Sequence, residues 1–397
     1  MKQICIAGKN NIAVDVLSYL QDNYSKDFEF VAICNKTDCG VNTFQRSFKR
    51  YCLEQNIEIK SLEELYLVDD LIFISLEFDR IIKPSLFKTS KLFNIHFSLL
   101  PAYKGMYTSA LPILNGEEVA GVTFHRIDAG IDTGEIIDQK EIKIKEEDTC
   151  RDLYLKFINA GTSLVIKNLE NILKGIEVSR PQPIENSTYY SKKAIDYTTL
   201  KVDLNQTAEN IQRQIRAFSF REYQMPIVFG KNVIKCVVTN IRSIQKAGEI
   251  IIDSKRATMV STIDYNIVFY YDYTDELLNA CLNGDLTTVI EICSTKEQIN
   301  VSNEKGWTPL IIATYNNQKE IVNYLITHGA DIFAVSNNGT NLLMYAKDAY
   351  LRAGDNSLFK LFYNLGLSPN TKDYSDKDLF FYLKNNNISL NDLLGIS

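Results

Sequence analysis

An asparagine and a histidine, Asn94 and His96, stand two residues apart in the apolar run FNIHF, which predicts a β-strand. Alternate residues of a strand share a face, so the amide and the imidazole should point the same way. A later glycine-punctuated loop, DAGIDTG, presents Asp128 and Asp132 and can bring a carboxylate against the imidazole, fixing its orientation and stabilising its charged form. An amide, an imidazole and a carboxylate together suit acyl transfer to an amine. In that reaction one group accepts a proton from the attacking amine and another holds the oxyanion of the tetrahedral intermediate.

The chain has three histidines, which narrows the choice of a base. His125 follows Phe124 in an apolar run and is typical of a core histidine whose ring nitrogens are hydrogen-bonded within the protein. His328 belongs to the repeat described below, where we expect a structural role. His96 is therefore the candidate base.

Short apolar runs alternate with helical patterns through the first part of the chain, and several of the runs are apolar on both faces. This indicates an α/β fold with a parallel sheet covered on both sides. Ligand sites of such sheets lie beyond the carboxyl ends of the strands, where a loop containing Pro101 and Gly105 follows FNIHF. We expect strands at 2–7, 28–35, 71–77, 91–97, 119–127 and 135–144, and helices at 12–24, 44–56 and 149–174, the last capped by Gly175.

The segments NIHFSLLPAYKG and DAGIDTGEII together strongly resemble the folate-dependent formyltransferases, a family that includes the methionyl-tRNA and glycinamide-ribonucleotide enzymes. The resemblance covers about residues 1–190. It implies a Rossmann-like domain that uses N10-formyltetrahydrofolate. By motif position it implies that Asn94 binds the formyl oxygen, that His96 is the base for the attacking amine, and that Asp132 orients His96 and helps to manage the proton. The pterin is expected to contact Glu77, Phe78, Asp79 and Arg80, and the loop from Asp128 to Asp132.

Three further details resemble the nucleotide-sugar N-formyltransferase branch of this family. They are GKNNIAVD (8–15), the residues Tyr103, Met106 and Tyr107 in LLPAYKGMYTSALPILNG, and IRAFSFREYQMP (215–226). A base would stack on Phe220 or Tyr223, and Arg216 or Lys9 would face phosphate; AFSF as ordinary core is the alternative. The expected substrate-binding residues are Lys9, Asn10, Tyr107, Arg216, Phe220 and Tyr223.

The branch implies a dTDP-linked 3-amino- or 4-amino-dideoxyhexose as substrate, a role in bacterial surface polysaccharide (O-antigen) synthesis, and a homodimer. Other acceptors, methionyl-tRNA or a UDP-aminosugar, remain open. A further alternative is that the repeats described below form a scaffold and that the enzyme domain is a relic. The segment GKNN matches neither a G-x-G-x-x-G nor a Walker loop, so we expect no NAD or ATP site.

The pattern of expected strands and helices changes at two points along the chain. After RPQP (180–183) a small, mostly β domain with one helix is expected at 186–272, following a catalytic domain at 1–185. In the remainder, 273–397, GWTPLIIA and GTNLLMYA recur with the 33-residue period of the ankyrin repeat, and HGAD adds to this resemblance. We expect an all-α domain of three to four stacked helix pairs.

The repeats suggest a second binding site, because such arrays commonly bind proteins on a concave face. Trp307 is the only tryptophan and stands at the start of the best-matched repeat, with Tyr273 and Tyr315 near it in the repeat pattern. We hypothesise that these three form an aromatic clasp for a partner protein or a regulatory nucleotide-sugar. A stabilising or dimer-spacing appendage is the alternative.

Composition narrows the remaining function classes. Lys+Arg 43 against Asp+Glu 49 gives a net charge of −6, which argues against sequence-independent binding to nucleic acid. Eight cysteines are scattered without a C-x-x-C pair, so we expect reduced thiols and no metal site. No apolar run is long enough to span a membrane, and the N-terminus does not resemble a signal peptide. We expect a cytoplasmic enzyme.

Overall fold

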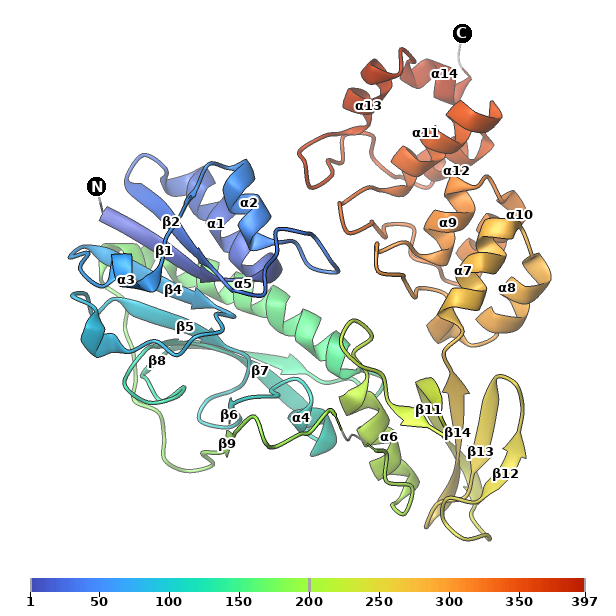
Figure 1. Ribbon diagram of the computed structural model, residues 1–397, viewed down its shortest axis with the longest axis horizontal. Coiled ribbons are helices and arrows are strands. Elements are labelled where there is room, and N and C mark those ends of the chain that lie inside the picture. Colours follow the sequence, from blue (N-terminus) through green and yellow to red (C-terminus); the bar gives the residue numbers. More distant parts are fainter. Residues whose placement is uncertain (1, 199–200, 396–397) are drawn as a thin grey trace.

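The computed structural model describes residues 2–198 and 201–395. Residues 1 and 396–397, the outer ends of the first and last expected domains, and residues 199–200 lie outside the described residues. Figure 1 shows three parts: an N-terminal α/β domain, a smaller sheet that we call the middle sheet, and a helical repeat array. This confirms the expected fold classes, while the boundaries at 185/186 and 272/273 stay predictions.

The N-terminal domain is built on a seven-stranded sheet with the order β3-β2-β1-β4-β5-β7-β8. Its first five strands in this order are parallel, whereas β7 pairs antiparallel with both β5 and β8. The sheet is thus mixed, not parallel throughout as expected. The connection from β7 to β8 is too short for a crossover, so these strands form a hairpin. The strands are β1 (Lys2–Gly8), β2 (Phe28–Cys34), β3 (Glu58–Ile59), β4 (Leu71–Leu76), β5 (Leu92–His96), β7 (Val119–Arg126) and β8 (Ile136–Lys143).

Helices α1 (Asn10–Tyr24) and α5 (Cys150–Lys174) cover one face of this sheet with a continuous apolar core. The expected helix at 149–174 is confirmed: the Thr149 side chain accepts the N–H of Asp152, and Gly175 ends the helix with φ 68°. The expected helix at 44–56 is partly wrong, because α2 (Phe48–Glu54) begins only after the N-cap Ser47. Shorter elements complete the domain: α3 (Leu62–Leu65), a 3₁₀ turn (Pro84–Leu86) and α4 (Leu111–Leu114).

The segment after RPQP is more than a linker. Its strand β9 (Tyr189–Tyr190) pairs with β6 (Lys104–Gly105), and the rings of Tyr190 and Tyr103 stack with centroids 5.6 Å apart. The chain therefore crosses back over the loop that follows β5. This return covers the region where the candidate site was expected.

The middle sheet has the order β10-β11-β14-β13-β12, and helix α6 (Ala208–Phe218) packs against it. Residues Ala217, Phe218 and Phe220 at the end of α6 belong to the core of the N-terminal domain, so α6 joins the two parts. The strands are β10 (Ile227–Val228), β11 (Lys231–Arg242), β12 (Ile250–Asp253), β13 (Ala257–Val260) and β14 (Tyr265–Tyr271).

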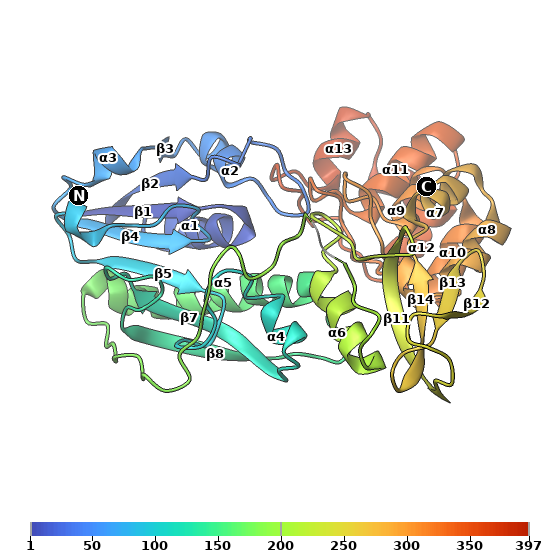
Figure 2. The same ribbon diagram turned by 60° about the horizontal axis from the view of Figure 1, so that its bottom comes forward.

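The repeat array consists of four helix pairs within the described residues, which confirms the expected helical repeats (Figure 2). In the best-matched repeat the Thr308 side chain caps α9 and Pro309 occupies its first turn. The helices are α7 (Thr274–Asn283), α8 (Leu286–Cys293), α9 (Pro309–Tyr315), α10 (Lys319–Thr327), α11 (Leu342–Ala353), α12 (Ser357–Asn364), α13 (Leu379–Asn385) and α14 (Leu390–Leu394).

Charged pairs and hydrogen bonds join the array to the middle sheet. Arg256 lies 3.3 Å from Glu276 and 3.1 Å from Glu291, and Gln298 donates from Nε2 to the carbonyl oxygen of Tyr271 at 3.0 Å. The first repeat is therefore fixed to the sheet. In residues 2–198 and 201–395 no helix is both long and apolar enough to cross a membrane.

Candidate active site

The candidate site lies at the carboxyl edge of the seven-stranded sheet. Strands β1, β4 and β5 are neighbours there and end at Gly8, Leu76 and His96. The residues that follow them, among them Asn10 and Glu77, are therefore brought to one edge.

Asn94 on β5 pairs directly with His125 on the antiparallel strand β7. The two side chains are hydrogen-bonded, with 3.0 Å between Asn94 Nδ2 and His125 Nε2. His125 Nδ1 lies 2.7 Å from the carbonyl oxygen of Arg126, so Nδ1 carries the proton and Nε2 accepts from the amide. Burial lowers the pKa of His125 to about 4, which keeps the ring neutral. One amide hydrogen of Asn94 is thus engaged and the second is available for a ligand.

His96 is buried at the end of β5. Its Nε2 lies 2.9 Å from the carbonyl oxygen of Tyr103, an acceptor, so this nitrogen donates. Its Nδ1 faces Asp132 Oδ2 at 3.4 Å. Nδ1 is therefore the nitrogen that can take up a proton, and the carboxylate stands where it would stabilise the resulting charge.

Asp132 is held from both ends. Its Oδ2 accepts the backbone N–H of Gly105 at 2.9 Å, and its carbonyl oxygen accepts Gln182 Nε2 at 2.9 Å. Its Oδ1 lies 3.8 Å from His125 Nε2. The structure thus brings Asn94, His96 and Asp132 together as expected from the sequence, and adds His125 to them.

The loop before β8 is tightly folded. Asp128 accepts the backbone N–H of Gly130 at 3.1 Å and the Thr133 hydroxyl at 2.6 Å. A Cβ on Gly134 would stand 1.8 Å from the carbonyl oxygen of Arg126, so only glycine fits this close approach. These contacts fix the course of the chain on both sides of Asp132.

A second polar cluster lies beside the catalytic candidates. Glu77 Oε2 accepts hydrogen bonds from the Tyr154 hydroxyl at 2.9 Å and from Asn10 Nδ2 at 3.2 Å. Burial raises the pKa of Glu77, an effect that the positive charge of Lys9 opposes. Next to it Phe78 packs in the core, Asp79 is exposed, and Arg80 lies 3.5 Å from Glu63. The pterin contacts expected at 77–80 stay a prediction.

Backbone strain collects around the site. Five non-glycine residues there have positive φ values: Asn10 (64°), Glu77 (59°), Tyr103 (57°), Tyr107 (62°) and Asp132 (55°). Such conformations cost free energy and persist where the surroundings enforce them, often at functional sites.

One expected substrate-binding residue needs correction, and a second is partly engaged. Arg216 donates from Nη1 to the carbonyl oxygens of Lys145 and Asp148, both at 3.2 Å, and burial lowers its pKa. Nη1 thus ties α6 to the N-terminal domain, while Nε is buried without a hydrogen-bond partner, and the phosphate contact of Arg216 stays a prediction. Phe220 is 4% exposed inside a cluster of aromatic rings, so it is core, the alternative reading of AFSF.

The other expected substrate residues remain accessible. Tyr223 packs its ring on Phe220 with centroids 4.6 Å apart, yet it is 60% exposed. Tyr107 is half-buried and donates its hydroxyl to the carbonyl oxygen of Lys192 at 2.9 Å. Lys9 and Asn10 lie at the start of α1.

The aromatic cluster on the repeats differs from the expected one in one member. Trp307 and Tyr315 lie 5.8 Å apart, and the third ring is Tyr345, at 5.8 Å and 6.0 Å from them. Tyr273 instead packs on Arg256, 4.8 Å from the ring centroid, at the junction with the middle sheet. The expectation for Tyr273 is therefore wrong.

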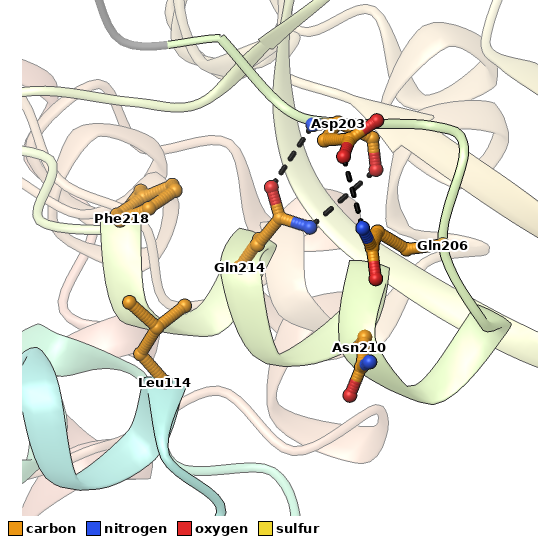
Figure 3. Close-up of a pocket in the computed structure, with 6 residues that line it drawn as sticks. All are labelled: Leu114, Asp203, Gln206, Asn210, Gln214 and Phe218. Carbon is orange, nitrogen blue, oxygen red and sulfur yellow. Dashed lines mark hydrogen bonds between the residues drawn. The ribbon is translucent and has the colours of Figure 1, made fainter.

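A cavity of about 390 Å³ opens between α4 and α6, away from the catalytic candidates (Figure 3). Hydrogen bonds between Asp203 and the side chains of Gln206 and Gln214 form its polar wall, and Phe218 adds an apolar side. Its lining residues include no histidine and none of the catalytic candidates. Within the described ranges, no group of three or more His, Cys, Asp or Glu side chains is placed to hold a metal ion.

Comparison with known proteins decides the family. Residues 30–169 match the formyl transferase family, and residues 277–373 match ankyrin repeats in three copies. The structure resembles WlaRD, a sugar 3N-formyl transferase crystallised with dTDP and 5-N-formyl-tetrahydrofolate, with 43% sequence identity and a TM-score of 0.64. That match covers 69% of this chain and 98% of WlaRD. The chain belongs to the formyltransferase family.

A second solved structure agrees with this assignment. The N-formyltransferase of Helicobacter canadensis, in complex with folinic acid and dTDP-3-aminofucose, is 42% identical to this formyltransferase, with a TM-score of 0.64. The match covers 68% of this chain and all of that one (100%).

Curated relatives are matched over shorter spans. The formyltransferase is 35% identical over 188 residues to the bifunctional polymyxin resistance protein ArnA of Wigglesworthia glossinidia brevipalpis, and 33% identical over 169 residues to the methionyl-tRNA formyltransferase of Halothermothrix orenii. It covers 28% and 53% of those proteins, and the matches cover 44% and 41% of this chain.

Sequence reasoning missed the contacts of two residues near the site. His125 is buried with both ring nitrogens in hydrogen bonds, which confirms its interpretation as a core residue. Its pairing with Asn94 was not predicted; an antiparallel register between 91–97 and 119–127 would have revealed it. Tyr154 lies on α5, far along the chain from Glu77, and carries no motif that singles it out. Both act on residues that the motifs did identify.

Proposed function

We propose that this formyltransferase transfers a formyl group from N10-formyltetrahydrofolate to the 3-amino group of a dTDP-linked 3-amino-dideoxyhexose. The observation that carries the proposal is the cluster of Asn94, His96, His125 and Asp132 at the sheet edge. The similarity at 43% and 42% to enzymes solved with dTDP or dTDP-3-aminofucose supports the 3-amino class over the 4-amino class.

The donor set fits a formyl group. Asn94 keeps one amide hydrogen after bonding His125, and this hydrogen would hold the formyl oxygen as negative charge develops there. N10-formyltetrahydrofolate supplies the formyl carbon that the sugar amine attacks. The expected contacts of the pterin are those with Glu77, Phe78, Asp79 and Arg80 and with the loop that begins at Asp128.

The proton of the attacking amine has a defined route. As the new bond between carbon and the sugar nitrogen forms, that nitrogen loses a proton to His96 Nδ1, which faces Asp132. The carboxylate stabilises the imidazolium. The proton returns to the folate nitrogen as its bond to the formyl carbon breaks, so the site is left in its starting protonation state.

The nucleotide part of the substrate would meet the residues that remain accessible. Tyr223 offers an exposed ring for the thymine. Lys9, the N-cap residue of α1, offers a positive charge for the diphosphate at the N-terminus of that helix. Asn10 and Tyr107 would line the sugar pocket.

The test is a panel assay with N10-formyltetrahydrofolate as donor and dTDP-3-amino-, dTDP-4-amino- and UDP-aminosugars and methionyl-tRNA as acceptors, with products identified by mass. We expect one added formyl group on a dTDP-3-aminosugar. Formylation of a 4-amino or UDP-linked sugar alone would overturn the choice of substrate. Formylation of methionyl-tRNA alone would favour the second candidate, which the 33% identity to a methionyl-tRNA formyltransferase supports.

We also propose that the enzyme is a homodimer assembled through the middle sheet. Four residues in mutual register form an apolar row across one face: Val237 pairs with Val268, Val268 with Met259, and Met259 with Ile252. Val237 is 37% and Ile252 is 56% exposed. A face of this kind is typical of an interface. Sedimentation of a Val237→Glu/Ile252→Glu variant as a monomer, beside a dimeric wild type, is the expected result.

In the cell we propose a cytoplasmic step in O-antigen synthesis, which follows from the proposed substrate. A mutant strain lacking the enzyme should make surface polysaccharide without the N-formyl group. Polysaccharide with unchanged formyl content would contradict this role.

We further propose that the repeat array holds a second ligand, a regulatory nucleotide-sugar, with a partner protein as the alternative. Trp307, Tyr315 and Tyr345 form an aromatic cluster, Lys305 lies over Trp307 at 5.5 Å, and Arg352 lies over Tyr315 at 3.7 Å. Aromatic rings flanked by cations suit a base and a diphosphate.

A further inference from the structure

The last repeat reaches back to the N-terminal domain. The ring of Tyr374, in the loop before α13, lies 5.2 Å from the guanidinium carbon of Arg46, in the loop before α2. Figures 1 and 2 both place these two loops side by side. Around the contact, helices α1 and α2 and the loop at 373–377 line a cleft of about 790 Å³.

The loop presents Tyr374 rigidly. Asp373 Oδ1 accepts the backbone N–H groups of Ser375 at 2.8 Å and Lys377 at 3.1 Å. The N–H of Tyr374 donates to the carbonyl oxygen of Asn338 at 2.9 Å. A Cβ on Gly339 would stand 2.8 Å from Tyr374 N, so glycine permits this packing. The ring position is therefore set by the repeat array.

Arg46 in turn holds the start of α1. Its backbone N–H donates to Asn11 Oδ1 at 2.9 Å, and its guanidinium pairs with Asp15. The neighbouring Gln45 accepts the N–H of Asn11 at 3.1 Å. Asn10, the residue before, is the strained residue that bonds Glu77 and Tyr154 in the candidate site.

The array is thus anchored at both ends, through Arg256 and Gln298 at the middle sheet and through Tyr374 at the N-terminal domain. The match with WlaRD covers 98% of WlaRD but only 69% of this chain. Almost no residues of WlaRD therefore remain that could form such an array. The contact between Tyr374 and Arg46 is therefore a feature of this chain and not of WlaRD.

We propose that Tyr374 and Arg46 are positioning residues, through which the repeat array holds the loop at 38–47 on α1 and keeps Asn10 in place in the substrate site. An exposed cation–π contact has a strength that corresponds to about a three-fold change in an equilibrium. The contact should therefore tune the site and not switch it off. The kinetic consequence rests on the proposed function, whereas the structural one does not.

The experiment compares Tyr374→Ala with Tyr374→Phe, which keeps the π face, in the full-length protein. Hydrogen exchange measured by mass spectrometry should show about three-fold less protection at 9–16 and 38–47 in Tyr374→Ala, and wild-type protection in Tyr374→Phe. With a confirmed substrate, KM for the sugar should rise about three-fold in Tyr374→Ala with kcat unchanged. Wild-type protection at both segments in Tyr374→Ala would overturn the proposal.

Two further readouts separate the possible failures. If protection in Tyr374→Ala also falls at residues 379–394, the comparison is repeated with Tyr374→Leu, which fills the same space without a π face. Reduced protection at 9–16 and 38–47 in Tyr374→Leu supports the proposal, and wild-type protection at both segments overturns it. If no aminosugar is formylated, the proposed function fails, yet the exchange measurement still tests the contact.

Discussion

Asn94 Nδ2 and His125 Nε2 lie 3.0 Å apart on directly paired residues of antiparallel strands. Because the imidazole donates its other N–H to a backbone carbonyl, it fixes the orientation of the amide. The nitrogen of the Asn94 amide therefore faces His125 and its second hydrogen is left for a ligand. In the proposed mechanism the buried histidine therefore positions the amide that holds the formyl oxygen and does not itself contact the reacting atoms.

His125→Gln should lower kcat by about ten- to a hundred-fold with little change in KM, because Asn94 loses its fixed orientation. Steady-state kinetics with a dTDP-3-aminosugar measures this. Unchanged kcat in a folded variant would show that His125 serves packing alone.

The pH dependence of stability should also depend on His125. Its pKa is about 4 in the folded protein and about 6.5 in an unfolded chain. The unfolded state therefore binds the proton first as the pH falls below 6.5, so the native state loses up to about 3 kcal/mol between pH 6.5 and 4. Urea unfolding at pH 7 and at pH 4.5 should show a smaller difference for His125→Gln than for the wild type. Equal differences would contradict the assigned pKa.

Asp132→Asn should reduce kcat by about a hundred-fold or more, because the charge that stabilises a protonated His96 is removed while the acceptor for Gly105 N–H remains. Binding of dTDP, followed by calorimetry, should be retained. Asp138→Asn is the matched control, since that carboxylate pairs with Lys167 on α5. An equal loss in both variants would indicate a general effect of charge.

Gly134→Ala should destabilise the protein by about 1–3 kcal/mol and also depress activity, because the added Cβ would collide with the carbonyl oxygen of Arg126 and displace Asp132. Gly354→Ala is the control. It has φ 70° and open space around it, so it should cost about 1 kcal/mol through backbone strain alone, with normal kinetics. Thermal unfolding and kinetics of both variants test this, and normal activity in Gly134→Ala would refute the tight packing.

Trp307 offers a direct test of the second ligand, because it is the only tryptophan of the chain. Titration with a dTDP-sugar should change its fluorescence, and Tyr345→Leu should weaken the response by removing a packed ring. Emission that is unaffected by the nucleotide-sugar would leave a partner protein as the remaining candidate for this cluster.

The sequence predicts the elements well where a single segment contains the information. Apolar runs identify the long strands, and Thr149 and Gly175 mark both ends of α5. Features set by pairing and packing were not predicted: the antiparallel direction of β7 and the partner of Asn94. For Phe220 the sequence left substrate contact and core packing open, and the structure shows core packing. The two backbone carbonyl oxygens that Arg216 Nη1 contacts could not be predicted either, because a basic residue near aromatic ones has the same sequence pattern with or without such contacts.

The two anchors of the repeat array also limit its length. Packed helices are spaced about 8–10 Å apart, so one added or deleted repeat would carry Tyr374 by that distance away from Arg46. In this enzyme the number of repeats therefore sets the distance between the two anchors. Chimaeras that exchange repeats should keep the same number of repeats even where they change the sequence.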